Sequence, residues 1–374
     1  CQDSQTGQEM RRTIEQIARQ ISTKDEPKGT QLPFPASLDE QSRKRLDLTV
    51  KLFAMPVLVK NAERGRLYVF SSDPEYVWTP TRRKLVQLVA DQTAVAIANH
   101  ELTVELRVKE RQDRELEIAS EIQLRLLPSQ CPKIQGVELA AECRTANRVG
   151  GDYYDFIPTN YDQWRYNDKG EAQAACVPWS IAIGDVMGKG VPAGLIMTMT
   201  RGMLRAEVLN RHSPAQILQH LNRVMYADLE NSHRFVTLFY SEYDPRTRVL
   251  SYSNAAHHPL LLWKAASRSI EPLDTKGMLI GLDADSQYED AQVQLESGDI
   301  VLYYTDGVTD AVNQNGDRFE EGNLYRAFQW ACEHCRAPQA ILDYLFDEVQ
   351  QFIGSGKTDT DDMTLVVMQV KSPE

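Results

Sequence analysis

Four aspartate motifs constrain this chain most strongly, because each stands where a predicted strand ends. They are Gly150-Gly151-Asp152, Gly184-Asp185-Val186-Met187-Gly188-Lys189-Gly190, Thr305-Asp306-Gly307 and Asp361-Asp362-Met363-Thr364. A carboxylate at a buried strand end is costly to desolvate unless it is paired or bound to a metal. No matching set of lysines and arginines accompanies the motifs, so their carboxylates would repel one another if they converged. We therefore expect a divalent cation among them.

The chemistry of that cation follows from the ligands. All-oxygen ligands favour Mg²⁺ or Mn²⁺ over zinc. Two such ions about 3.5–4 Å apart form a clamp for phosphoryl chemistry and lower the pKa of a bound water. Each motif alone is a weak signal, because Asp-Gly is common in turns. Their joint occurrence in this order is much more specific.

The strands and helices predicted after residue 136 come in groups rather than in strict alternation. Strands are expected at 137–143, 153–157, 180–185, 235–243, 249–255, 260–263, 291–295, 300–305 and 364–370. Helices are expected at 192–209, 214–229, 321–335 and 338–353, and residues 159–178 read as a surface insertion. Many short strands with few helices predict the α+β class, a β-sandwich flanked by helices.

The N-terminal third has a different pattern. Residues 1–45 are polar, and two strand-like runs at 49–60 and 66–70 are separated by a turn at 61–65. A helix is expected to start at Pro80, capped by Thr79 or Thr81, and could run to Leu127 before Pro128 ends it. Its heptad seam is half polar, which leaves open a coiled coil or two shorter packed helices.

Composition excludes some classes of function. The formal charge of −12 argues against nucleic-acid binding and against electrostatic docking on anionic lipid. No apolar run approaches the roughly 18 residues that span a bilayer. The start, Cys1-Gln2-Asp3, has no initiator methionine and no signal-peptide pattern, which we interpret as the start of a fragment.

The six cysteines are scattered, which fits a reducing cytoplasm. The one close pair, Cys332 and Cys335, could be half of a zinc or redox site, but we expect packed, small apolar side chains.

Taken together, the motifs carry a resemblance to a known family. The chain is similar over about residues 115–371 to the SpoIIE/RsbU-type branch of the PPM (PP2C-like) phosphatases. The matching stretches are residues 150–156, 184–194, 305–309 and 361–365, with further matches at 234–240, 254–259 and the entry helix 122–128. The departures, Ala255-Ala256-His257-His258-Pro259 and Phe319-Glu320, remove no metal ligand.

The resemblance implies a two-metal protein phosphatase in which Asp185 and Asp152 are the catalytic residues. Asp185 would bridge both ions, Asp152 and the Val186 carbonyl would hold one, and Asp306 and Asp361 the other. A bridging hydroxide would attack phosphorus in line. Motif alignment prefers Asp361 to Asp362, and the sequence leaves that choice open.

The resemblance also implies partners and a domain organisation. The substrate would be a phosphoserine or phosphothreonine protein of the STAS-type anti-sigma-factor antagonist class. Residues 1–104 would form a regulatory segment that resembles part of a GAF domain, 105–128 a helical linker able to form a homodimer, and 129–374 the phosphatase domain.

The same motifs allow two other functions to be considered. A catalytically silent module that docks partners is disfavoured because all four motifs are intact. A diguanylate cyclase is rejected because Tyr153-Tyr154 replaces the expected Glu-Phe.

Three further groups near the motifs have both a functional and a structural interpretation. Arg148 could bind a substrate phosphate or be a solvated surface arginine. Lys189 could have an electrostatic role beside Asp185, but exposure to solvent is the favoured interpretation. His257 and His258 could supply a general acid, but a structural hydrogen bond is the more common role of such histidines.

Overall fold

The computed structural model describes residues 51–71, 73, 75–146, 149–159, 177–354 and 361–371. Predictions for residues 1–50, for Arg148 and for most of the insertion at 159–178 lie outside these residues. The chain divides into two compact units between Arg111 and Gln112, and each is described by itself. None of the described helices is both long and apolar enough to cross a membrane.

The first unit contains a β-hairpin and most of a long helix. Strands β1 (Lys51–Val59) and β2 (Ala62–Ser71) pair in antiparallel fashion. The predicted turn at 61–65 is wrong: the turn is Lys60-Asn61, both with positive φ, and residues 62–65 belong to β2. Such a two-residue turn matches the right-handed strand twist, and a bulge after Val57 absorbs the extra length. The resemblance of residues 1–104 to part of a GAF domain stays a prediction.

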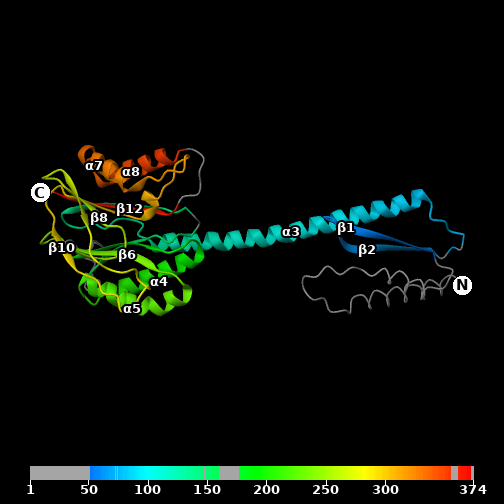
Figure 1. The fold of residues 1–374 in the computed structure, drawn as a ribbon, viewed down its shortest axis with the longest axis horizontal. Coiled ribbons are helices and arrows are strands. Elements are labelled where there is room, and N and C mark those ends of the chain that lie inside the picture. Colours follow the sequence, from blue (N-terminus) through cyan, green and yellow to red (C-terminus); the bar gives the residue numbers. More distant parts are fainter. Residues whose placement is uncertain are drawn as a thin grey trace, which may run out of the picture. The chain divides into compact units, whose positions relative to one another are not determined.

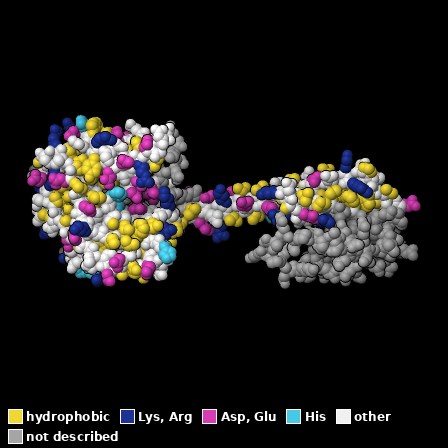
Figure 2. Space-filling model, in the orientation of Figure 1, with side chains coloured by type: hydrophobic (Ala, Val, Ile, Leu, Met, Phe, Trp, Pro, Cys, Tyr) yellow, Lys and Arg dark blue, Asp and Glu magenta, His cyan; other side chains and the backbone are white. Residues whose placement is uncertain are grey.

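Helix α3 (Pro80–Leu126) is one continuous element, so the alternative of two shorter helices is wrong. The Thr79 hydroxyl caps its start by accepting a hydrogen bond from the amide of Arg82 at 3.3 Å. Ala90 and Ala94 pack against Val57 and Val59 of the hairpin. Most other side chains of α3 are exposed, and Figure 2 shows acidic, basic and apolar groups mixed along its visible face.

The second unit is built from two five-stranded antiparallel sheets. The first has the order β10-β7-β6-β5-β4 and the second β3-β12-β11-β8-β9. Their strands are β3 (Val137–Arg144), β4 (Tyr153–Pro158), β5 (Trp179–Val186), β6 (Val236–Asp244), β7 (Val249–Ala255), β8 (Leu260–Lys264), β9 (Ser269–Leu273), β10 (Ala291–Gln294), β11 (Ile300–Tyr304) and β12 (Met363–Val370).

Helices cover the outer face of each sheet (Figure 1). Helices α4 (Val191–Val208) and α5 (Pro214–Ser232) pack on the first sheet, while α7 (Glu320–His334) and α8 (Pro338–Ile353) pack on the second. The result is a four-layer sandwich, which confirms the predicted α+β class. Strand β11 is buried along its whole length because it has a sheet on one face and helices on the other.

The structure contains two elements that the sequence did not predict. Strand β9 has mostly exposed side chains, includes Pro272 and forms a sheet edge, where proline is tolerated. The short helix α6 (Asp306–Thr309) starts at one of the aspartate motifs. Cys332 and Cys335 are free and pack at the margin of the core between α7, α8 and the second sheet, as predicted.

Candidate active site

Hydrogen bonds to Asp152 link the two sheets. Asp152 lies just before β4 of the first sheet and is almost fully buried. Its Oδ2 atom accepts hydrogen bonds from the hydroxyls of Thr305 at 2.8 Å and Thr364 at 2.6 Å, both in the second sheet's region. The Thr305 hydroxyl also accepts a bond from the amide of Thr364 at 2.9 Å. Both threonines belong to the aspartate motifs, but sequence reasoning assigned them no role.

Gly151 explains how Asp185 and the Val186 carbonyl reach the Asp152 loop. A Cβ atom on Gly151 would stand 2.7 Å from the Val186 carbonyl oxygen and 2.8 Å from Asp185 Oδ1. Only glycine permits that approach. The Val186 amide donates to the Gly151 carbonyl at 3.3 Å, which holds the end of β5 against the loop. Three of the expected metal-binding groups therefore lie around one glycine.

The electrostatics show that the other acidic motifs gather at the same place. Burial, and then repulsion from Asp306 and Asp361, raises the pKa of Asp185 to about 7. Burial and the charge of Asp185 raise the pKa of Asp152 well above its usual range. Burial and Asp361 raise the pKa of Asp306. The four motifs, which lie far apart in sequence, thus form one acidic cluster in which negative charge is unfavourable unless a proton or cation neutralises it.

Asp361 and Asp362 have different surroundings. Asp362 is buried, and its two oxygens accept bonds from the amides of Ala146 and Gly151, each at 2.8 Å. Asp361 is partly exposed and forms an ion pair with Lys189, whose Nζ lies 3.2 Å from Oδ2. Lys189 is half exposed, as expected, but it is paired rather than merely solvated.

The donor set fits hard divalent cations. Every candidate ligand is an oxygen, the carboxylates repel one another, and the Gly151 cradle keeps the approach to Asp185 open. The spacing is loose, however. Among the described residues, the one group of three His, Cys, Asp or Glu side chains with ligand atoms within 4.8 Å of one another lies elsewhere, at Glu207, His212 and His220.

The end of α3 also reaches the site. The buried Gln123 side chain donates from Nε2 to the Gly150 carbonyl at 2.7 Å, and its Oε1 accepts from the Gly150 amide at 3.0 Å. Gly194 of α4 packs closely against the loop that carries Asp152, because a Cβ at Gly194 would stand 2.4 Å from Val149 Cγ1. The loop that carries Asp152 is thus held between two helices. The family resemblance singled out the entry helix 122–128, but nothing local in the sequence predicted that Gln123 would contact Gly150.

The two histidines differ in role. His257 is buried, with Nδ1 2.9 Å from the Thr237 hydroxyl and Nε2 3.1 Å from the Tyr304 carbonyl. Burial lowers its pKa to about 3, so it stays neutral and structural. His258 is partly exposed and lies over the Tyr304 ring, with centroids 5.3 Å apart.

Several known proteins resemble this chain. A family model for Stage II sporulation protein E (SpoIIE) matches residues 178–371. The phosphoserine phosphatase RsbU of Bacillus subtilis (strain 168) is 30% identical over 258 residues, which cover 69% of this chain and 70% of RsbU. The phosphoserine phosphatase RsbP of the same organism is 26% identical over 200 residues, 53% of this chain and 45% of RsbP.

Two solved structures share the fold. The SiaA-PP2C domain of Pseudomonas aeruginosa has a TM-score of 0.56 at 19% identity, covering 71% of this chain and 99% of that one. The PP2C phosphatase domain of SpoIIE from Bacillus subtilis, with a fragment of its regulatory domain, has a TM-score of 0.50 at 19% identity, covering 64% of each chain.

Proposed function

The chain belongs to the SpoIIE family of PPM-type protein serine/threonine phosphatases, and we propose that its acidic cluster holds two divalent cations for the hydrolysis of phosphoserine or phosphothreonine on a protein. The family is metal-dependent; the number of ions and their identity, Mn²⁺ or Mg²⁺, are part of the proposal. The observation that carries it is the meeting of acidic residues from different motifs around the buried Asp185: burial, and then repulsion from Asp306 and Asp361, raises its pKa to about 7.

In this proposal the ligands divide around Asp185. Asp185 would contact both ions, Asp152 and the Val186 carbonyl would hold one, and Asp306 and Asp361 would hold the other. Because the threonine bonds to Asp152 both end on Oδ2, we assign its Oδ1 to the cation. Asp361 is preferred to Asp362 because backbone amides already occupy both oxygens of Asp362.

Bound Mg²⁺ or Mn²⁺ would supply an activated water for in-line attack and would neutralise charge on the phosphoryl group. The chain's own residues position these ligands. Thr305 and Thr364 orient Asp152, while the amides bonded to Asp362 fix the strand end that carries Asp361. Lys189 beside Asp361 holds a positive charge at the rim, where an anionic phosphate would enter. Arg148 lies outside the described residues, and its phosphate contact stays a prediction.

A matched comparison of two variants tests this function. We expect the full chain to hydrolyse p-nitrophenyl phosphate with Mn²⁺, EDTA to abolish the activity, and Asp185→Asn to reduce it by about 100-fold or more. Asp310→Asn is the control, because Asp310 is a partly exposed carboxylate next to α6 that pairs with Arg318 at 2.7 Å. Activity that persists in EDTA or in Asp185→Asn would contradict the two-metal assignment.

Two further measurements distinguish an active phosphatase from a catalytically silent docking module. That alternative predicts Mn²⁺ binding by calorimetry without turnover of any phosphorylated protein. The observation that favours the docking module is the wide spacing of the carboxylates in the acidic cluster. Intact-mass measurement of a phosphorylated STAS-type antagonist, which we propose as the substrate class, distinguishes turnover from mere binding.

The N-terminal residues are proposed to regulate the site. We keep residues 1–104 as a regulatory segment, 105–128 as the linker and 129–374 as the phosphatase domain. Gln123 supports this proposal because it joins α3 directly to the Asp152 loop. Homodimerisation through α3 is supported by the exposed Leu88, Val95 and Leu102, which share one heptad position. Sedimentation of wild type and Leu102→Lys tests it, with a monomeric wild type as the contrary result.

A further inference from the structure

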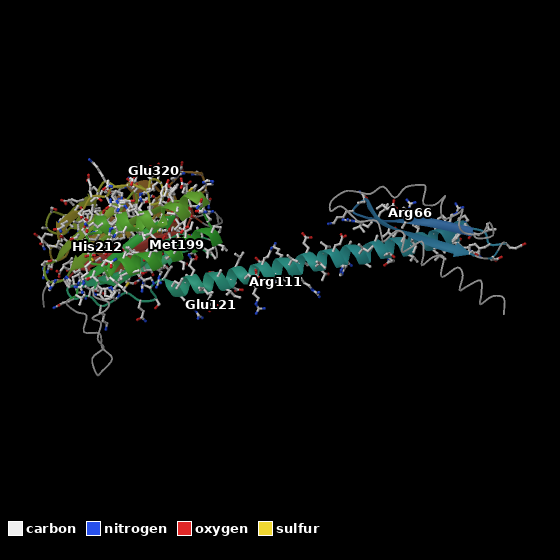
Figure 3. All side chains as sticks on the ribbon, turned by 90° about the horizontal axis from the view of Figure 1, so that it is seen from below. Arg66, Arg111, Glu121, Met199, His212 and Glu320 are labelled. Atoms are coloured by element: carbon white, nitrogen blue, oxygen red, sulfur yellow. The ribbon has the colours of Figure 1, made fainter. Side chains whose placement is uncertain are left out.

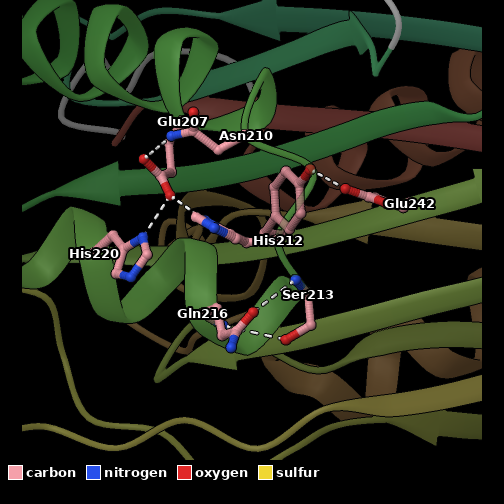
Figure 4. Close-up of polar contacts among 8 residues, drawn as sticks. Glu207, Asn210, His212, Ser213, Gln216, His220 and Glu242 are labelled. Carbon is pink, nitrogen blue, oxygen red and sulfur yellow. Dashed lines mark hydrogen bonds and ion pairs between the residues drawn. The ribbon is translucent and has the colours of Figure 1, made fainter.

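A second cluster of metal-binding side chains lies where α4 meets α5. Glu207 is in the last turn of α4, His212 is in the connection, and His220 is in the second turn of α5. The connection turns sharply because Arg211 adopts a positive φ of 57°. A capping box then starts α5, in which Ser213 and Gln216 exchange hydrogen bonds (Figure 4). These local features bring the two helix ends together.

The three side chains converge on one atom. Glu207 Oε1 lies 2.9 Å from His212 Nδ1 and 2.6 Å from His220 Nδ1. The two imidazole rings meet edge to face, with centroids 4.8 Å apart. Figure 4 shows both rings directed at the same carboxylate oxygen, His212 from the connection and His220 from α5. Two nitrogens and one oxygen thus form a compact donor set.

The carboxylate is oriented by a further residue. Asn210 donates from Nδ2 to the other oxygen, Oε2, at 2.8 Å. This leaves Oε1 facing the two imidazoles and fixes the rotation of the carboxylate. Outer groups of this kind commonly orient metal ligands. The side chains of His212 and His220 are each 38% exposed and that of Glu207 is 17% exposed, so solvent can reach the cluster.

We propose that Glu207, His212 and His220 bind Zn²⁺, with water as the fourth ligand. Two imidazoles and a carboxylate suit four-coordinate zinc, unlike the all-oxygen cluster around Asp185. Ligand bonds of about 2.0 Å require neighbouring donors to stand roughly 3.3 Å apart. The nitrogen–oxygen distance therefore has to widen by about 0.4 Å for His212 and by about 0.7 Å for His220. In each neutral imidazole the proton moves from Nδ1 to Nε2, and Nδ1 then binds the metal.

The position of the site indicates a structural role. Helix α4 has 18 residues and begins beside the Asp185 loop, so its far end lies about 27 Å away along the helix. The ion would therefore not be a third catalytic metal. It would clamp α4 to α5, and α4 packs on β4 and β5, the strands that adjoin Asp152 and carry Asp185. The inference does not depend on the proposed phosphatase mechanism.

Cobalt substitution separates this site from the acidic cluster. We would titrate Co²⁺ into the chelator-treated full chain carrying Asp185→Asn, which weakens the acidic centre. One equivalent should give the strong visible absorption of four-coordinate Co²⁺, and Zn²⁺ should displace it. Six-coordinate Co²⁺ among oxygen ligands absorbs only weakly.

Three variants in the same background give the contrast. His220→Gln should abolish the absorption and the rise in Tm caused by Zn²⁺. Asn210→Ala should weaken Zn²⁺ binding about tenfold or more. His100→Gln, at an exposed position of α3, should change neither the Co²⁺ absorption nor the rise in Tm caused by Zn²⁺.

Two results would overturn the proposal. One is only weak, six-coordinate absorption in the Asp185→Asn chain, which would identify the cluster as hydrogen bonds alone. The other is unchanged Zn²⁺ affinity in a His220→Gln chain whose circular dichroism shows that it is folded.

Discussion

Replacing Thr364 with valine tests whether the second sheet positions Asp152. The change keeps the shape of the side chain but removes the hydroxyl that donates to Asp152 Oδ2 at 2.6 Å. A hydrogen bond to a charged group contributes about 1.5–3 kcal/mol. Because this bond favours the charged carboxylate, its loss raises the pKa of Asp152 further. The variant should therefore bind a divalent cation less well.

The expected size follows from that free energy. A loss of about 1.5–3 kcal/mol corresponds to roughly a 10- to 150-fold weaker Mn²⁺ affinity at neutral pH. Titration calorimetry would measure the affinity, and the Mn²⁺ dependence of p-nitrophenyl phosphate hydrolysis would measure its effect. At saturating Mn²⁺ we expect much of the activity to return.

Two controls interpret the result. Thr364→Ser restores the hydroxyl and should recover most of the affinity. Thr103→Val makes the same chemical change on the exposed face of α3, where the hydroxyl only donates to the Asn99 carbonyl, and should have no effect. If Thr364→Val binds Mn²⁺ as tightly as wild type does, Asp152 is not a ligand oriented by this bond and the reasoning fails.

Three further outcomes are expected. The metal-free protein should lose stability as the pH rises from about 4 to 7, because the raised pKa of Asp185 means that the folded state binds the proton more tightly than the unfolded state does. The fall in Tm over this range should be smaller in Asp185→Asn, and smaller in the wild type when Mn²⁺ is present. Gln123→Ala leaves both polar groups of Gly150 without their partner and should lower the free energy of unfolding by about 2–4 kcal/mol in urea titrations. It should also lower the Mn²⁺ affinity. An unchanged affinity would show that the end of α3 does not influence the metal site. Asp361→Asn should weaken Mn²⁺ binding with little change in Tm. Asp362→Asn presents an amide nitrogen to a backbone N–H and should lower stability by about 1–3 kcal/mol. The reverse pattern would exchange the roles assigned to the two residues.

Local sequence was sufficient for most of the architecture. Strands such as β5, β11 and β12 were predicted to within one or two residues, because a strand covered on both faces must be a continuous apolar run. The two ends of α3 were predicted from a cap at Thr79 or Thr81 and the stop at Pro128, whereas its continuity was left open. The acidic motifs could be found for a similar reason: glycine and aspartate at a strand end are adjacent in sequence.

The contacts that orient those aspartates were decided by tertiary structure. Thr364 lies 212 residues from Asp152, and Gln123 lies 27 residues from Gly150, so only the packing of the sheets and of α3 brings these pairs together. The different surroundings of Asp361 and Asp362 likewise depend on amides from a distant loop. Glu207 and His220 share no motif, and the turn between α4 and α5 makes them neighbours. Backbone preference and burial pattern are encoded locally, whereas side-chain partners depend on which surfaces the folded chain brings into contact.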